Sequence, residues 1–218
     1  MPYYPKINVL FIHIPKTGGS FVAGALEKHS PLLLQTGQSN TILPPPFNKY
    51  SLQHQYFTTI EKYQSLLKID ITNATVFSIV RNPYDRIVSD LFFCSLITKK
   101  SSPDEVFDVM KKYYLNDINK RGYGLDGHCR PQYLFVSDDN GQLLSTIKIF
   151  KLETLSDCNA EFNTYLNTNV NLQHSSSVNG ASRGVKYDSF LNKDSIMLIN
   201  ETYKKDFELF NYEMRQPV

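Results

Sequence analysis

The chain has 218 residues, of which 41% are hydrophobic and 13% aromatic, and its formal net charge is +2. A chain of this length can bury one sizeable core, so we expect a single domain that spans residues 1–218. The near balance of charge excludes the basic tail or stripe of a nucleic-acid binder. We therefore expect no nucleic-acid partner, and any anion site must be local.

The cysteines and the N-terminus indicate a reducing compartment. Cys94, Cys129 and Cys158 are an odd number without Cys-x-x-Cys spacing, which argues against a disulfide framework or a zinc site. The N-terminus lacks the cationic lead, long apolar core and cleavage site of a signal peptide. No apolar run approaches the roughly 20 residues that cross a bilayer. These features predict a soluble, cytoplasmic protein.

The first predicted elements form a strand, a loop and a helix. Residues 7–14 are apolar on both alternating rows, which is typical of a buried strand in a parallel sheet. A helix is expected from Phe21 to about His29. Residues 30–55 are rich in Pro, Asn and Gln and predict a long irregular connection, and loops of that length inside compact domains tend to be functional.

Strands and helices continue to alternate along the rest of the chain. We expect helices at 56–67, 82–92, 102–115, 161–166 and 193–210, and strands at 74–80 and 146–152. Thr58 or Thr59 is the expected cap of the first of these helices, and Asn82 caps the second, with Pro83 at its first position. The alternation indicates an α/β fold with a central parallel sheet and right-handed crossovers.

The loop PKTGGS, residues 15–20, contains the groups of an anion-binding turn. Its glycines allow backbone N–H groups to approach an anion closely, Lys16 adds a mobile charge, and Thr17 and Ser20 add hydroxyl groups. The nucleotide-triphosphate pattern Gly-x-x-x-x-Gly-Lys-Ser/Thr is absent, because Ser20 follows the second glycine. The loop alone leaves open an ordinary strand-to-helix turn with a solvated lysine.

A second anion-suited segment, IVRNPYDRIVSDLFF, follows the strand at 74–80. Arg81 lies just past the strand end and can form two parallel hydrogen bonds to a phosphate. Ser89 lies on the second turn of the next helix. Ligands of parallel α/β sheets bind at the carboxyl edge, where we expect this segment and the loop at 15–20 to lie. Two such segments imply a ligand with two separated anionic groups.

The two motifs, in this order, resemble the sulfotransferase superfamily that uses 3′-phosphoadenosine 5′-phosphosulfate (PAPS). They are most similar to the carbohydrate O-sulfotransferase branch, sulfotransferase family 2. The resemblance implies a P-loop-like three-layer fold with a central parallel sheet flanked by helices. It also implies that Arg81 and Ser89 bind the 3′-phosphate. The implied ligands of the 5′-phosphosulfate are Lys16, Thr17, Gly18, Gly19, Ser20 and Phe21.

Weaker resemblance extends over most of the chain. HQYFTTIEKYQSLL resembles a segment in which a histidine, here His54, precedes a helix between the two motifs. GHCRPQYLFV resembles a His-x-x-Pro-Gln stretch of several members, which here begins at His128. SRGVKY resembles a late loop, so Arg183 and the Gly184 backbone are implied to reach the 3′-phosphate. IFKLETL and KKDFELFNY resemble the family's third strand and C-terminal helix.

The implied reaction is an in-line transfer of the sulfuryl group from PAPS to an acceptor hydroxyl, which leaves the product PAP. Lys16 would stabilise the charge that develops on the bridging oxygen. The reaction needs no metal. A base must take the acceptor's proton, and histidine suits this because its unperturbed pKa is about 6.5. We expect His54 to be the base, with a capping or surface role as the alternative. His128 either orients the acceptor or is a loop histidine tied to the backbone.

Two other function classes stay open. A small P-loop-type kinase or nucleotidase is disfavoured because the second strand ends at Arg81 and not at an aspartate for Mg²⁺. A catalytically inactive nucleotide-binding module would keep the same loops. The expected acceptor is a glycan or another small molecule. Family members that modify glycans in the secretory pathway usually carry a membrane anchor, so a Golgi location is expected only if such an anchor has been removed.

Overall fold

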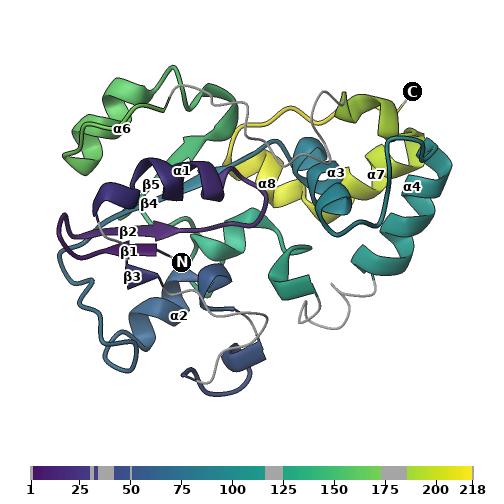
Figure 1. Ribbon diagram of the computed structural model, residues 1–218. Helices are drawn as coiled ribbons and strands as arrows, with labels where there is room; N and C mark the ends of the chain where they lie inside the picture. Colours follow the sequence, from purple (N-terminus) through teal and green to yellow (C-terminus); the bar gives the residue numbers. More distant parts are fainter. Residues whose placement is uncertain are drawn as a thin grey trace. The chain divides into compact units, whose positions relative to one another are not determined.

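The computed structural model describes residues 2–29, 32–33, 42–49, 51–115, 125–172 and 186–217. The chain forms two compact units, and each is built from two stretches of sequence (Figure 1). Unit 1 comprises Met1–Val80 and Gln132–Ser175, and unit 2 comprises Arg81–Pro131 and Ser176–Val218. The single domain expected from the sequence stays a prediction.

Unit 1 contains a five-stranded sheet with the order β3-β1-β2-β4-β5. Its strands are β1 (Pro2–Tyr4), β2 (Val9–Ile12), β3 (Leu32–Leu33), β4 (Thr75–Val80) and β5 (Ile147–Lys151). The strands β2, β4 and β5 run parallel, which confirms the expected parallel sheet. The strand β1 is antiparallel to both β2 and β3, and the sequence did not predict these two short strands.

Apolar side chains on both faces explain why β2 and β4 lie inside the sheet. All four residues of β2 are buried, as a strand covered on both sides requires. On one face, Phe11 stacks on Phe77 with ring centroids 4.7 Å apart, and Phe77 meets Phe162 of the next layer edge to face at 5.3 Å. Such aromatic pairs add about 0.5–1.5 kcal/mol each beyond the burial of their area.

Three α-helices of unit 1 are described, together with short 3₁₀ turns. The helices are α1 (Gly19–Ala25), α2 (Phe57–Lys62) and α6 (Asn159–Leu166). The 3₁₀ turns are Glu27–His29, Phe47–Lys49, Leu52–His54, Gln132–Phe135 and Leu152–Thr154. The expected cap of α2 was wrong: Tyr56 is its N-cap, and Thr59 is buried inside the helix. The helix also ends at Lys62, earlier than expected.

Unit 2 is helical in the part of the chain that the structure describes. Its helices are α3 (Pro83–Phe93), α4 (Pro103–Met110), a π-helical turn (Lys111–Leu115), 3₁₀ turns at Leu125–Gly127 and Tyr187–Phe190, α7 (Lys193–Thr202) and α8 (Lys204–Leu209). The predicted cap of α3 is confirmed, because the Asn82 side chain accepts a hydrogen bond from the Tyr84 N–H at 3.0 Å. The expected C-terminal helix is divided at Tyr203.

The core of unit 2 surrounds α3. Helix α3 contributes five fully or almost fully buried apolar side chains, and they pack with side chains of α4, α7 and α8. These five residues are Tyr84, Ile87, Val88, Leu91 and Phe92. The helix is therefore held on several sides, which fixes the direction of its polar side chains as well.

In the described ranges, no helix combines the length and the apolar character that crossing a bilayer requires.

Candidate functional site

The loop at residues 15–20 of unit 1 joins β2 to α1 through two left-handed residues. Gly18 has φ 89° and is the N-cap of α1, and Lys16 has φ 65°. A side chain at position 18 would also lie 2.6 Å from Cδ1 of Leu152. The left-handed region costs a residue other than glycine about 1–2 kcal/mol. Strain of the kind seen at Lys16 is concentrated at binding and catalytic sites.

The hydroxyl groups of the loop differ in their surroundings. Thr17 is fully buried, and its Oγ1 donates to the carbonyl oxygen of Ile14 at 2.9 Å. Ser20 is exposed. The Phe21 side chain is partly buried against the sheet core. The Thr17 hydroxyl thus holds the turn together, which leaves its backbone N–H as its means of contact with an anion.

His13 lies directly against the second glycine of the loop. A Cβ atom at Gly19 would be 1.9 Å from Nε2 of His13, which is far inside van der Waals contact. The His13 ring also stacks on Phe11, with ring centroids 5.5 Å apart. Glycine at position 19 therefore allows the histidine ring to approach the loop backbone.

A pair of glycine substitutions in α1 tests this packing. We expect Gly19→Ala to lower the free energy of unfolding by about 1–3 kcal/mol, because the packed His13 ring must move. A Cβ atom added at Gly24 would meet nothing within 4 Å, so Gly24→Ala should raise that free energy by about 0.5–1 kcal/mol. Urea denaturation measures both. Equal effects of the two substitutions would contradict the close approach of His13.

His54 is the second histidine beside this loop. It ends the 3₁₀ turn Leu52–His54, is buried, and meets the His13 ring edge to face with centroids 5.1 Å apart. The turn is held by the next residue, since Nε2 of Gln55 donates to the carbonyl oxygens of Phe47 and Ser51, each at 3.1 Å. Within unit 1, the buried His54 ring therefore packs on His13, which in turn lies against Gly19 of the loop. Its role as the base stays a prediction.

The predicted phosphate ligands Arg81 and Ser89 belong to unit 2. Arg81 precedes α3, and its guanidinium carbon lies 5.1 Å from the centroid of the Tyr187 ring. Ser89 lies on the second turn of α3 and is buried. A guanidinium carries planar N–H groups that can bind two oxygen atoms of a phosphate.

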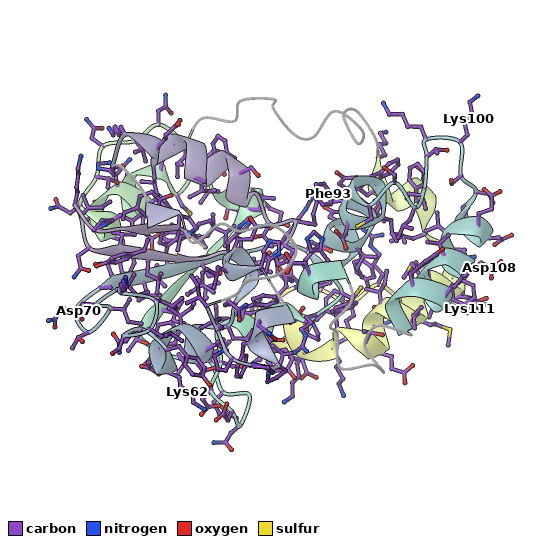
Figure 2. The ribbon with its side chains drawn as sticks, turned by 60° about the horizontal axis from the view of Figure 1, so that its bottom comes forward. Lys62, Asp70, Phe93, Lys100, Asp108 and Lys111 are labelled. Carbon is purple, nitrogen blue, oxygen red and sulfur yellow. The ribbon has the colours of Figure 1, made fainter. Side chains whose placement is uncertain are left out.

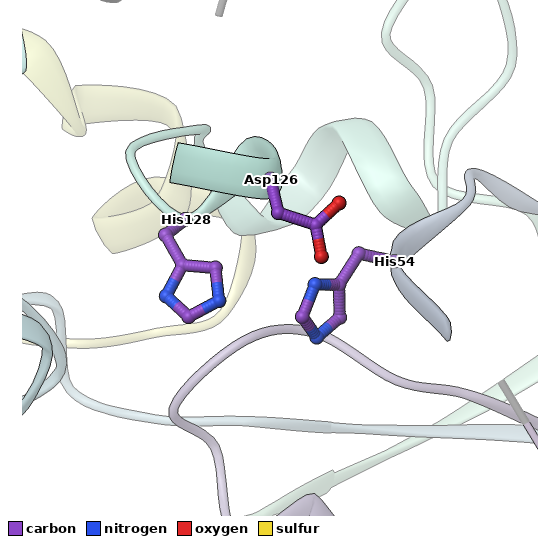
Figure 3. Close-up of side chains that lie close together, drawn as sticks. All are labelled: His54, Asp126 and His128. Atoms are coloured by element: carbon purple, nitrogen blue, oxygen red, sulfur yellow. The ribbon is translucent and has the colours of Figure 1, made fainter. Parts of the chain in front are cut away.

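His128 lies against a buried carboxylate of the same unit. Its Nδ1 is 2.5 Å from Oδ1 of Asp90, and the two side chains are only 9% and 2% exposed. The ring stacks on Phe93 with centroids 5.5 Å apart and planes inclined by 17°. A carboxylate oxygen of Asp126 lies within 4.8 Å of a His128 ring nitrogen, and Figure 3 draws both side chains. His128 is thus hydrogen-bonded to the side chain of Asp90, a contact that the sequence did not predict.

The backbone around His128 is fixed as well. Arg86, which is almost fully buried in α3, donates from Nη2 to the carbonyl oxygen of His128 at 2.8 Å. The Tyr203 hydroxyl donates to the carbonyl oxygen of Cys129 at 2.7 Å. Burial raises the pKa of Tyr203 well above its usual value, so this hydroxyl stays protonated and able to donate.

The structure adds Asp90 to the residues that the sequence indicated. Nothing in the sequence separates this aspartate from a solvated helix residue, and its partner lies far along the chain. The Sγ atom of Cys94 lies 3.9 Å from Oδ1 of Asp90, the same oxygen atom that contacts His128. Asp90, Cys94 and His128 could supply three ligand atoms to a metal ion, but the 2.5 Å contact is a hydrogen-bond distance that needs none. Arg183, Gly184 and His174 lie outside the described residues.

Each unit fits an anionic group on its own local evidence. In unit 1, a lysine in the left-handed conformation precedes two glycines whose backbone N–H groups belong to the turn, and the absence of side chains at these glycines leaves room for Leu152 and His13. In unit 2, Arg81 precedes α3 and the buried Ser89 lies on the second turn of the same helix. Both donor sets suit the phosphate and phosphosulfate groups of PAPS.

Comparison with known protein families agrees with this chemistry. The model of the sulfotransferase family matches residues 3–213. No curated protein matches the chain in a sequence search. The match covers nearly the whole chain and includes both motifs, the loop at 15–20 and the segment from Arg81 to Ser89. The chain therefore belongs to the sulfotransferase family and is an enzyme that transfers a sulfuryl group from PAPS.

Proposed function

We propose that the enzyme sulfates a hydroxyl group of a carbohydrate, with a histidine as the base. The observation that carries this proposal is the contact between His54, His13 and Gly19 in unit 1. It brings an imidazole ring beside the loop whose lysine and glycines suit a phosphosulfate. Reaction and donor follow from the family, whereas the acceptor and the residue roles are our proposal.

The 5′ end of the donor is assigned to residues 15–21. The backbone N–H groups of Thr17, Gly18 and Gly19 and the exposed Ser20 would hold the phosphosulfate, with Phe21 supporting the loop from the core side. Lys16 would place its ammonium group at the bridging oxygen. This oxygen gains charge as its bond to sulfur breaks, and a fixed cation lowers the free energy of that transition state.

The 3′-phosphate is assigned to Arg81 and Ser89. Arg81 presents a planar guanidinium that can bind two phosphate oxygens at once, and Ser89 presents a hydroxyl from the same helix segment. Arg183 and Gly184 complete this set by the resemblance to the family. This phosphate is not altered by the reaction, so these residues bind and orient the donor.

Removal of the acceptor's proton is assigned to His54. A base must lie within hydrogen-bond reach of the attacking hydroxyl and must be neutral before the reaction. His128 is the second histidine of the proposal, and it would orient the acceptor through a hydrogen bond. Lys16, His54 and His128 would thus respectively stabilise the leaving group, take the proton and position the nucleophile.

An exposed aromatic ring supports a carbohydrate as the acceptor. Phe93, labelled in Figure 2, lies at the end of α3 and leaves 55% of its surface exposed. Its ring stacks on the ring of His128. The C–H faces of sugar rings pack on such aromatic rings, while the sugar hydroxyls need polar partners at the edge. Phe93 with His128 offers both kinds of contact.

Cofactor binding tests the proposal against its alternatives. PAP should raise the melting temperature by mass action, and ATP with Mg²⁺ should not. A larger shift with Mg-ATP would favour a kinase, and no shift with saturating PAP would contradict the proposal. Transfer of labelled sulfate from PAPS to a panel of unsulfated glycans then separates an enzyme of this specificity from an inactive nucleotide-binding module.

Arg81→Lys tests the assignment of the 3′-phosphate. We expect the affinity for PAP to fall by about 10-fold or more, because lysine cannot form the two parallel hydrogen bonds. The affinity for adenosine 5′-monophosphate, which lacks the 3′-phosphate, should change little. Titration calorimetry measures both ligands, and Arg130→Lys in the same unit is the control. An equal loss of affinity for both nucleotides would show that Arg81 does not bind the 3′-phosphate.

A further inference from the structure

We propose that Arg215, near the end of the chain, is a positioning residue for donor binding, because it holds the Tyr187 ring in place against the guanidinium of Arg81. All three residues belong to unit 2, and the contacts that join them stand on the geometry of this unit alone. The effect on the donor rests on the proposed function, in which Arg81 binds the 3′-phosphate.

The backbone of Arg215 is bound to two helices of unit 2. Its N–H donates to the Tyr84 hydroxyl at 2.8 Å, and its carbonyl oxygen accepts a hydrogen bond from Nδ2 of Asn200 at 2.9 Å. Tyr84 lies in the first turn of α3, Asn200 lies in α7, and the Tyr84 hydroxyl donates to Oδ1 of Asn200. Burial raises the pKa of Tyr84, which keeps its hydroxyl protonated for this bond. The three residues close a ring of hydrogen bonds, which fixes residue 215 against the start of α3.

The side chain of Arg215 extends from this fixed backbone to the 3₁₀ turn Tyr187–Phe190. Its guanidinium carbon lies 4.4 Å from the centroid of the Tyr84 ring, and its Nη2 forms an ion pair with Oδ1 of Asp188. An ion pair between exposed side chains contributes little by itself, because ordering two side chains costs entropy. Here the Tyr84 ring and the backbone bonds already order the arginine, so the ion pair can hold the turn in place.

The two halves of the turn Tyr187–Phe190 have different supports. At its end, the buried Phe190 ring packs edge to face on Phe92 of the core, with centroids 5.2 Å apart. At its start, Asp188 leaves 72% of its side chain exposed and forms the ion pair with Arg215. The core thus fixes the second half of the turn, and the ion pair adds a support to the first half.

The first half of the turn carries the ring on which Arg81 rests. Tyr187 directly precedes Asp188, and its ring centroid lies 5.1 Å from the guanidinium carbon of Arg81. Attraction between the cation and the aromatic face limits the directions that the guanidinium takes. Two parallel hydrogen bonds to a phosphate require one orientation of its plane. Arg215 therefore acts on donor binding through Tyr187, from a position two residues past the stretch 3–213 that the family model matches.

Nuclear magnetic resonance of the enzyme without nucleotide tests these contacts directly. The Nε–H signal of Arg81, assigned by its loss in Arg81→Lys, should carry a ring-current shift from Tyr187 and should move in Tyr187→Leu. We expect the same signal to move in Arg215→Ala and in Asp188→Ala. Lys204→Ala, which breaks another exposed ion pair of unit 2, is the control and should leave the signal in place.

Binding measurements then test the effect on the donor. Arg215→Ala should weaken the binding of PAP by about 3- to 10-fold, because one cation loses its orientation, and should leave the affinity for adenosine 5′-monophosphate unchanged. Tyr187→Phe keeps the ring and should keep the affinity for PAP. When Tyr187→Leu is already present, Arg215→Ala should cause no further loss, because it acts through that ring. Titration calorimetry measures each affinity.

The outcomes separate this proposal from the proposed function. An unmoved Arg81 signal in Asp188→Ala would overturn the proposal, even if Arg215→Ala failed to fold. Additive losses of PAP affinity in the double variant would overturn it too, and so would an equal loss for adenosine 5′-monophosphate. If the wild type did not bind PAP, the proposed function and the effect on the donor would fail together. The Arg81 signal would then still decide whether Arg215 holds Tyr187 against Arg81.

Discussion

Replacing Lys16 by glycine should lower the rate of sulfuryl transfer by about 10²–10³-fold, because the ammonium group at the bridging oxygen is lost. The same substitution should leave the stability of the fold unchanged or higher by up to about 1 kcal/mol. Lys16 has φ 65°, a conformation that glycine adopts without steric cost. Relief of this strain offsets the extra flexibility that glycine gives the unfolded chain.

The chain offers a matched control for this prediction. Lys68 is also a left-handed lysine of unit 1, with φ 56°, and its side chain is exposed on a turn after α2. Lys68→Gly should change stability in the same direction as Lys16→Gly and should leave transfer unaltered. Initial rates with labelled PAPS and urea denaturation of both variants measure the two effects. Full activity of Lys16→Gly would show that the loop lysine does not face the bond that breaks.

Local signals in the sequence predicted the loop and the start of α3 correctly. The apolar rows of residues 7–14 indicated a buried strand, and Asn82 with Pro83 indicated where α3 begins. These features depend on neighbours along the chain, such as a side-chain cap or the alternation of a strand. Short-range rules are sufficient for them.

Features that depend on the tertiary fold were missed. The strands β1 and β3 are three and two residues long, too short for a periodic pattern to emerge. The division of the last helix at Tyr203 accompanies a hydrogen bond to the carbonyl oxygen of Cys129, which no local pattern could indicate. In both places a long-range contact decides the local conformation.

The residues of the candidate site also fall into those that local sequence patterns predict and those that only the tertiary fold brings together. The glycines of the loop, Arg81 and Ser89 were predicted as site residues because their spacing matches a family pattern, and this assignment stays a prediction. The approach of His13 to Gly19 and the Asp90–His128 pair were not found, because each joins residues whose proximity only the fold creates.

Replacing His54 by glutamine should lower kcat by about 10²–10⁴-fold, since glutamine fills similar space and cannot take the acceptor's proton. The stabilisation by PAP should be retained, because His54 is assigned to the acceptor's proton and not to the nucleotide. His29→Ala is the control, since this histidine ends the 3₁₀ turn Glu27–His29 and has no role in the proposal. Steady-state kinetics with labelled PAPS measure kcat and KM for each variant.

Rescue by added imidazole distinguishes a base from a structural histidine. His54→Ala opens space where the buried ring stood, and free imidazole that enters it could restore proton transfer. If imidazole restores transfer by His54→Ala and does not restore transfer by His128→Ala, His54 is the base and His128 orients the acceptor. Rescue at His128 alone would exchange the two roles and make Asp90 the residue that orients the base. Undiminished transfer by His54→Gln would remove His54 from the reaction.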